Sequence, residues 1–243
     1  IGGISVLKEI VKLMPNEDCI FFGDSVNAPY GTKELSQIQE IVMDRAQHLY
    51  SKGIKALVVA CNTATSAALP ALRAAYPRLH VVGVVEPGAE AACAASASGR
   101  IAVIATEATI RGGAYERAIL RRRPGARVQS RACPLFVSMT EDGLVDGPLA
   151  EGLAARYLDD IFRGPRERGE ETPDCLVLGC THFPLLAGAV AKVVYREKTV
   201  GLHSPDRALL SRELRRFTAS ANYMLNCGMG ILGMVVAAVA LIW

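Results

Sequence analysis

Three features are absent from this sequence: a strong net charge, a regular spacing of cysteines and a secretory signal. Its 243 residues include 27 basic and 24 acidic side chains, so the formal net charge of +3 gives no field that favours nucleic acid or an anionic surface. The seven cysteines are an odd number without the spacing of a disulfide framework, which indicates reduced thiols and a cytoplasmic location. Because the charged run Lys8, Glu9 and Lys12 follows the first residues at once, we expect no signal peptide.

The motifs of common cofactor and metal sites are missing as well. The run Gly31, Thr32, Lys33 lacks the spacing of a phosphate-binding loop, and no lysine is marked as a pyridoxal ligand. Cys175, Cys180 and His182 lack a fourth ligand and a C-x-x-C pair, which disfavours zinc. The basic run 121–123 is typical of a solvated helix end. We therefore expect no cofactor, no metal and no nucleic acid, but a small-molecule substrate.

What the sequence does contain is an alternation of apolar strands and amphipathic helices. With 51% hydrophobic and 21% charged residues, the chain is globular and long enough for one large domain or two small ones. Predicted strands cover 18–22, 56–60, 80–85, 101–105 and 175–179, and predicted helices cover 34–52, 65–75, 115–123 and 151–162. This order is typical of an α/β fold with doubly wound parallel sheets.

Two segments about half a chain length apart repeat one short pattern. Residues 55–65 read KALVVACNTAT and residues 174–184 read DCLVLGCTHFP: an apolar strand, a small residue, a cysteine and a polar turn. Two similar halves that face each other across a cleft place Cys61 and Cys180 on opposite walls. Open α/β sheets bind their ligands at such carboxyl ends of strands.

Two thiols on opposite faces of one carbon suit the inversion of a stereocentre. One thiolate removes a proton while the other thiol donates one, and the ordinary thiol pKa allows either form after a modest shift. Backbone N–H groups at the start of the next helix lower the pKa of such a thiol, and His182 exchanges a proton with Cys180. A cysteine at a strand end is more often only a small buried residue. The paired turns favour the chemical interpretation of Cys61 and Cys180.

Four separate blocks resemble the glutamate racemases of bacterial cell-wall synthesis. They read GGISVL at 2–7, FGDS and APYG between 22 and 31, ACNTAT at 60–65 and GCTHFP at 179–184, and the resemblance extends to about residue 214. It implies an isomerase that interconverts L- and D-glutamate for peptidoglycan with two thiols and no cofactor. It also implies a homodimer and two similar α/β domains related by pseudo-twofold symmetry, with a cleft between them.

The resemblance assigns roles to individual residues. It implies that Cys61 and Cys180 are the catalytic thiols, that His182 assists Cys180, and that Glu141 is an acidic residue of the site, although Asp142 is an equal alternative. The positions that hold the glutamate carboxylates and amine in the family correspond to Pro29, Tyr30, Gly31, Asn62, Thr63, Thr109 and Thr181.

The sequence departs from the family before Gly2. Family members carry a strand that ends in Asp-Ser-Gly there, in which the aspartate assists the first cysteine and the serine binds substrate. We expect the first sheet to lack an interior element and the chain as written to have a preformed pocket with reduced turnover. Restoring such a strand is expected to raise the rate.

The second departure is an apolar tail. Residues 224–243 read MLNCGMGILGMVVAAVALIW, long enough to span a bilayer as a helix, so we predict either a membrane anchor, a buried helix or an aberrant chain end. The predicted division places 1–86 with 188–218 in the first domain, 87–187 in the second, and 219–243 in the tail.

Two alternative functions stay open. An aspartate or hydantoin racemase of the same superfamily differs in the room that the pocket leaves for the side chain. A non-catalytic remnant that only binds an amino acid is compatible with the lack of an Asp-Ser-Gly strand.

Overall fold

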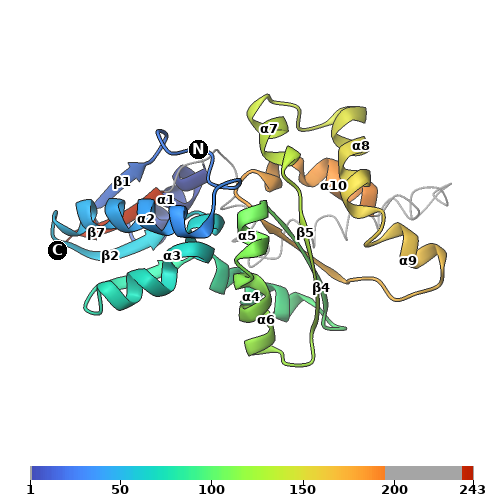
Figure 1. Ribbon diagram of the computed structural model, residues 1–243, viewed down its shortest axis with the longest axis horizontal. Helices are drawn as coiled ribbons and strands as arrows, with labels where there is room; N and C mark the ends of the chain where they lie inside the picture. The colour runs from blue at the N-terminus through green and yellow to red at the C-terminus, as the bar shows by residue number, and fades with distance from the viewer. Residues whose placement is uncertain (1, 195–236, 243) are drawn as a thin grey trace.

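The protein consists of two α/β halves that lie side by side (Figure 1). The computed structural model describes residues 2–194 and 237–242. The sheet of the first half has the strand order β1-β7-β2-β3, and the sheet of the second half has the order β5-β4-β6. The predicted α/β class with two sheet-containing halves is confirmed.

The strands and helices alternate along most of the described chain. The strands are β1 (Cys19–Gly23), β2 (Ile54–Val59), β3 (His80–Gly83), β4 (Arg100–Ala105), β5 (Arg127–Ala132), β6 (Cys175–Gly179) and β7 (Ala237–Ile242). The helices are α1 (Gly2–Leu13), α2 (Leu35–Tyr50), α3 (Asn62–Ala75), α4 (Val85–Ala95), α5 (Glu107–Arg111), α6 (Ala114–Arg122), α7 (Leu135–Glu141), α8 (Gly147–Leu158), α9 (Arg163–Glu167), the 3₁₀ helix η1 (Phe183–Leu186) and α10 (Ala187–Val194).

One strand of the first sheet comes from the far end of the chain. β7 lies between β1 and β2 and pairs antiparallel with both, whereas β2 and β3 pair parallel. The expectation of a wholly parallel sheet is therefore wrong for the first half, and the interior place that we expected to be lost is occupied. The backbone N–H and C=O groups of a buried apolar run form hydrogen bonds either within a helix or with a strand on each side. Here β1 and β2 are the two neighbouring strands.

This strand also corrects part of the predicted membrane helix. Residues 237–242 belong to the predicted span 224–243 but are β7, while residues 224–236 and 243 lie outside the described residues. Within 2–194 and 237–242, no helix combines the length and apolar character needed to cross a membrane.

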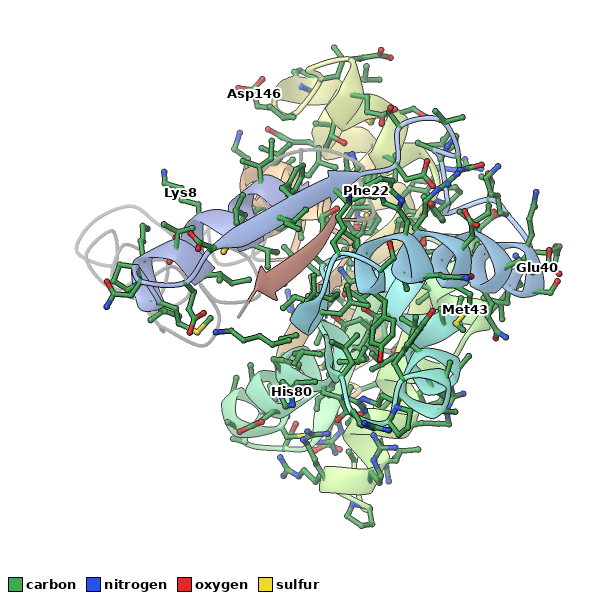
Figure 2. All side chains as sticks on the ribbon, turned by 90° about the vertical axis from the view of Figure 1, so that its left-hand side faces the viewer. Lys8, Phe22, Glu40, Met43, His80 and Asp146 are labelled. Atoms are coloured by element: carbon green, nitrogen blue, oxygen red, sulfur yellow. The ribbon has the colours of Figure 1, made fainter. Side chains whose placement is uncertain are left out.

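Helices cover both faces of the first sheet. α1 packs against β1 and β7 on one face, and α2 and α3 pack on the other, as Figure 2 shows with Lys8 on α1 and Met43 on α2. Successive residues of β2 point to opposite faces. Leu57 and Val59 join the core beneath α2 and α3, and Val58 packs on the side of α1. The sheet is thus buried on both faces, which explains its continuous apolar sequence.

The second sheet is parallel and is also covered on both faces. Ile101 and Val103 of β4 face the core formed with α4 and α6. Ala102 and Ile104 face the core formed with α7, α8 and α10. β5 was not predicted, because its sequence RVQSRA is polar and lies at the edge of the sheet.

The helix α10, which follows η1, packs in the second half. α10 contacts α8, and its residues Val190 and Val193 are buried in the same core as Phe136. The predicted return of the chain to the first domain at residue 188 is therefore not seen up to Val194. Residues 195–218 lie outside the described residues, and the full domain division stays a prediction.

Candidate active site

A pocket opens between the two halves, where the carboxyl ends of their strands meet. The empty space of this pocket is about 740 Å³ when its open mouth is included. The walls come from the segments that follow β1, β2, β4, β5 and β6. The lining residues are Pro29, Tyr30, Gly31, Thr32, Cys61, Asn62, Thr63, Thr106, Glu107, Pro134, Val137, Ser138, Glu141, Cys180, Thr181 and His182.

Cys61 lies at the turn from β2 into α3. It is the residue before the helix, and its carbonyl oxygen accepts a hydrogen bond from the N–H of Thr65 at 2.8 Å. Burial raises the pKa of the Cys61 thiol, and hydrogen bonds from the N–H groups of Ala64 and Thr63 and from the Thr63 hydroxyl oppose this rise. The start of α3 therefore supplies donors to a thiolate at Cys61, although burial still favours the thiol.

Cys180 occupies the matching turn after β6. Its side chain is buried, and burial raises the pKa of its thiol to about 12. Donation from the N–H groups of His182 and Phe183 and from the Thr181 side chain lowers the same pKa. Each thiol thus has two backbone N–H donors and a threonine beside it, which explains the repeated cysteine and threonine in the sequence.

The two thiols affect each other's ionisation. A negative charge on Cys61 raises the pKa of Cys180, so the two groups titrate as a pair. One thiolate opposite one thiol is then favoured over two thiolates. A base on one wall and an acid on the other are what proton exchange at a carbon between them requires.

His182 lies between Cys180 and Glu141. Its Nδ1 is 3.7 Å from Sγ of Cys180, and its Nε2 is 3.8 Å from Oε1 of Glu141. The ring is 1% exposed, and burial lowers the pKa of His182 to about 4, so the imidazole is neutral at pH 7. The carboxylate of Glu141, which is half-exposed, favours the proton on Nε2 and leaves Nδ1 able to accept a hydrogen bond from the Cys180 thiol.

The structure places all the predicted site residues on this pocket except Thr109. Thr109 stands behind the wall, where its hydroxyl lies 3.0 Å from that of Thr63 and 2.9 Å from that of Thr106. Thr63 and Thr106 are themselves 3.0 Å apart. Because Thr63 belongs to the first half and the other two belong to the second, the three hydroxyls join the halves beside the pocket.

Asn62 is held by a second bond between the halves. The hydroxyl of Tyr115 on α6 donates a 2.7 Å hydrogen bond to Oδ1 of Asn62 at the start of α3. This bond fixes the orientation of the Asn62 amide, because its acceptor is occupied. The contact is buried and therefore costly to lose.

Several lining residues were missed by the sequence analysis. Thr106 precedes α5 and accepts a hydrogen bond from the N–H of Thr109 at 3.4 Å, so the pattern Thr106, Glu107 was a helix-start signal that could have found it. Val137 and Ser138 lie on the short helix α7 and carried no such signal.

Among the described residues, the polar groups of the pocket wall include no lysine or arginine. Within residues 2–194 and 237–242, no cluster of three or more His, Cys, Asp or Glu is placed to hold a metal ion. The donors available to an anionic ligand here are hydroxyls, the Asn62 amide and backbone N–H groups at the turns.

Comparisons with known proteins agree with this geometry. A family model described as Asp/Glu/hydantoin racemase matches residues 2–202. The chain belongs to this racemase family. The resemblance noted in the sequence is thereby confirmed, and the two-domain fold class agrees with the solved structures of the family.

The relatives of this racemase are named glutamate racemases. One from Geobacter metallireducens is 44% identical over 216 residues, which are 89% of this chain and 77% of the relative. The crystal structure of a glutamate racemase from Bacillus anthracis matches with a TM-score of 0.70 at 35% identity, over 80% of this chain and 70% of that one. A glutamate racemase from Francisella tularensis, solved in complex with D-glutamate, matches with a TM-score of 0.70 at 34% identity over the same shares.

Proposed function

We propose that this protein interconverts L- and D-glutamate through Cys61 and Cys180, without a cofactor, and so supplies D-glutamate for peptidoglycan. The observation that carries the proposal is the pair of thiols on the two walls of one pocket, each with backbone donors at the end of a parallel strand. The names of the relatives and the D-glutamate complex of the Francisella tularensis enzyme support glutamate as the substrate.

The proposed reaction moves one proton off Cα and another onto its opposite face. With one enantiomer the Cys61 thiolate takes the Cα proton, and the Cys180 thiol then gives its proton to the other face, so the thiols exchange their protonation states. The opposite enantiomer runs the same steps in reverse. Donors fixed in place around the α-carboxylate stabilise the carbanion that forms between the two transfers.

The surroundings of the thiols set their proton affinities for these roles. Burial keeps both thiols protonated in the free pocket, because it raises both pKa values. The ammonium group of a bound amino acid brings a positive charge that favours a thiolate beside it. His182 is neutral and faces Cys180, so its Nδ1 is available to accept a hydrogen bond from that thiol.

The pocket has polar groups that suit an amino-acid substrate. We infer that Asn62, Thr63 and Thr181, which lie next to the cysteines, hold the α-carboxylate and the amine. Pro29, Tyr30 and Gly31 form a further wall for the rest of the substrate. The Thr109 hydroxyl acts behind Thr63 rather than on the substrate itself.

Exchange of the Cα proton with solvent tests the proposal most directly. Purified protein is incubated with each enantiomer of glutamate in D₂O, and deuterium at Cα is measured by NMR or mass spectrometry. We expect incorporation from both enantiomers, lost in Cys61→Ser and in Cys180→Ser. Glutamate binding without any exchange would favour the amino-acid-binding remnant.

Substrate competition separates glutamate from its rivals. Aspartate and a 5-substituted hydantoin are offered under the same conditions, because each differs in the room that it needs beside Cα. We expect glutamate to exchange at least about tenfold faster than either, since a lost methylene contact is worth a factor of this order. Faster exchange of aspartate would assign the chain to the other branch of its family.

Assembly and location stay predictions. A homodimer is expected from the resemblance and is checked by sedimentation equilibrium. A cytoplasmic location with or without membrane attachment is checked by fractionation of the chain with and without residues 219–243.

A further inference from the structure

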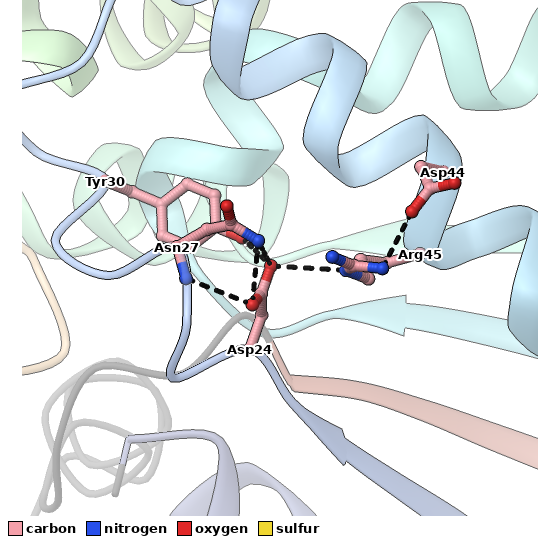
Figure 3. Close-up of polar contacts among 5 residues, drawn as sticks. All are labelled: Asp24, Asn27, Tyr30, Asp44 and Arg45. Atoms are coloured by element: carbon pink, nitrogen blue, oxygen red, sulfur yellow. Dashed lines mark hydrogen bonds and ion pairs between the residues drawn. The ribbon is translucent and has the colours of Figure 1, made fainter.

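A buried carboxylate lies just outside the pocket and is not used in the proposed chemistry. Asp24 follows β1 directly and is 3% exposed. It accepts hydrogen bonds from the Tyr30 hydroxyl at 2.7 Å, from the Asn27 backbone N–H at 3.2 Å and from the Asn27 side-chain amide at 2.9 and 2.7 Å (Figure 3). Nε of Arg45 on α2 lies 3.5 Å away. Asp24 does not line the pocket.

The donors around Asp24 keep it ionised. Burial acts to raise its pKa, but the hydrogen bonds from Tyr30 and Asn27 together with the charge of Arg45 outweigh burial and hold that pKa below its usual value. Three of these four donor groups belong to residues 27–30, which make the loop that leads into the pocket wall. The Asp24 carboxylate therefore holds this loop in its conformation through hydrogen bonds.

Tyr30 connects the Asp24 carboxylate to the pocket wall. Its ring lines the pocket and is 2% exposed, and its hydroxyl proton is directed to Asp24. The hydroxyl lies close enough to Cys61 for a thiolate there to raise the pKa of Tyr30, in addition to the effects of burial and of Asp24. Tyr30 thus joins Asp24 to the surroundings of one catalytic thiol.

The far end of the loop is fixed by the second half of the molecule. The carbonyl oxygen of Gly31 accepts a hydrogen bond from the N–H of Ala108 at 3.0 Å. A Cβ on Gly31 would lie 2.9 Å from the Thr106 side chain, so the backbone at Gly31 packs directly against Thr106. The loop is therefore held by Asp24 at one end and by α5 at the other, with Tyr30 between.

We propose that Asp24 is a positioning residue of this racemase: through Tyr30 and Asn27 it fixes the loop 24–31 so that Tyr30 and Gly31 form a rigid substrate-facing wall beside Cys61. The kinetic part of this inference rests on the proposed function, and the structural part does not. Asp24 touches no reacting atom and supplies no proton, so its loss weakens substrate binding more than it slows the chemical step.

Asp24→Asn tests the proposal because it keeps the shape of the side chain and removes its charge. We expect amide hydrogen exchange in residues 25–31 to accelerate at least about tenfold, with exchange in α2 and β2 unchanged, because only the loop loses its anchor. In the racemisation assay KM for glutamate is expected to rise about tenfold, with kcat within about threefold of the wild type.

Matched variants distinguish positioning from general damage. Asp44→Asn removes the exposed carboxylate that also binds Arg45, at 2.8 Å, and is expected to leave loop exchange and KM within about twofold. Asn27→Ala removes one donor but keeps the Asp24 charge, so it is expected to accelerate the same loop amides to a smaller extent. It replaces Asp24→Asn if that variant does not fold.

A double variant tests the route through Tyr30. Because Tyr30→Phe removes the bond that Asp24→Asn weakens, their combination is expected to accelerate loop exchange by less than the product of the two single effects. Independent, multiplying effects would overturn the proposal. So would unchanged loop exchange in Asp24→Asn, or acceleration spread equally over α2 and β2.

Failure of the proposed function has a different signature. If the wild type exchanges no Cα proton, the racemase assignment fails, whereas the hydrogen-exchange comparison still decides whether Asp24 fixes the loop. If the wild type is active and Asp24→Asn lowers kcat with KM unchanged, Asp24 takes part in the chemical step and the positioning role is wrong.

Discussion

The turns around Cys61 and Cys180 are alike in backbone and differ in the side chains that face them. Both thiols follow a parallel strand, and both receive two N–H donors and a threonine hydroxyl from the next residues. Cys180 also faces an imidazole at 3.7 Å. Cys61 instead has Tyr30 nearby, whose own proton is directed to Asp24.

The two thiols therefore have different neighbouring groups to adjust their ionisation. On the side of Cys180, a neutral histidine lies beside the thiol and can accept a hydrogen bond from it. On the side of Cys61, the groups that oppose the effect of burial on the pKa of the thiol are the N–H groups of Ala64 and Thr63 and the Thr63 hydroxyl. The same turn can therefore serve both halves of a two-base site, with the neighbouring side chains deciding how each thiol is tuned.

The largest expected effect comes from the thiols themselves. Cys61→Ser and Cys180→Ser are each expected to lower racemisation at least about 10³-fold, because a hydroxyl is a much weaker acid than a thiol and proton transfer contributes a factor of this order. Cys133→Ser is the matched control. Cys133 is a buried thiol at the carboxyl end of β5 that does not line the pocket, and near wild-type rates are expected. A Cys61 or Cys180 variant with ordinary turnover would contradict the two-thiol mechanism.

His182→Asn makes the surroundings of Cys180 more like those of Cys61. We expect kcat to fall about 10- to 100-fold, because the imidazole that contacts one thiol is lost. Alkylation by iodoacetamide, followed at each cysteine by mass spectrometry, is expected to slow at Cys180 relative to Cys61. An equal change at both thiols would show that His182 acts on the pocket as a whole.

The buried imidazole also makes stability depend on pH. The folded pKa of His182 is about 4, below its unfolded value of about 6.5, so the unfolded chain binds this proton more readily. This group therefore destabilises the fold as the pH falls from 6.5 towards 4, by about 2 kcal/mol between pH 7.5 and 4.5. Urea unfolding at the two pH values is expected to show this loss in the wild type and less of it in His182→Asn. His80→Asn, at an exposed position, is expected to behave as the wild type.

Glu141→Gln is expected to have the smallest effect. Its carboxylate is 49% exposed and 3.8 Å from Nε2 of His182, so solvent weakens its influence and kcat is expected to fall only about three- to tenfold. Asp142→Asn, next to it but outside the pocket, is expected to change kcat less than twofold. The reverse order would move the acidic role to Asp142, which the sequence alone left as an equal alternative.

The prediction of strands succeeded where a local pattern sufficed. The runs 101–105 and 175–179 are buried on both faces and continuously apolar, and such a sequence is typical of an interior strand. The strand β5 was not predicted, because a polar edge strand depends on its neighbour β4 for its hydrogen bonds. The helix prediction for residues 237–242 was wrong for a related reason, since an apolar run suits a helix as well as a strand until its partners are known.

The sequence by itself determined the two cysteine turns, because a strand, a cysteine and a helix start are adjacent in the chain and form by local hydrogen bonds. Only the tertiary structure decided what surrounds them. The approach of Glu141 to His182, the three threonine hydroxyls between the halves and the place of β7 between β1 and β2 all join residues that are distant in sequence. The importance of Asp24 became visible only from its burial, because a carboxylate without solvent must draw its donors from the surrounding fold.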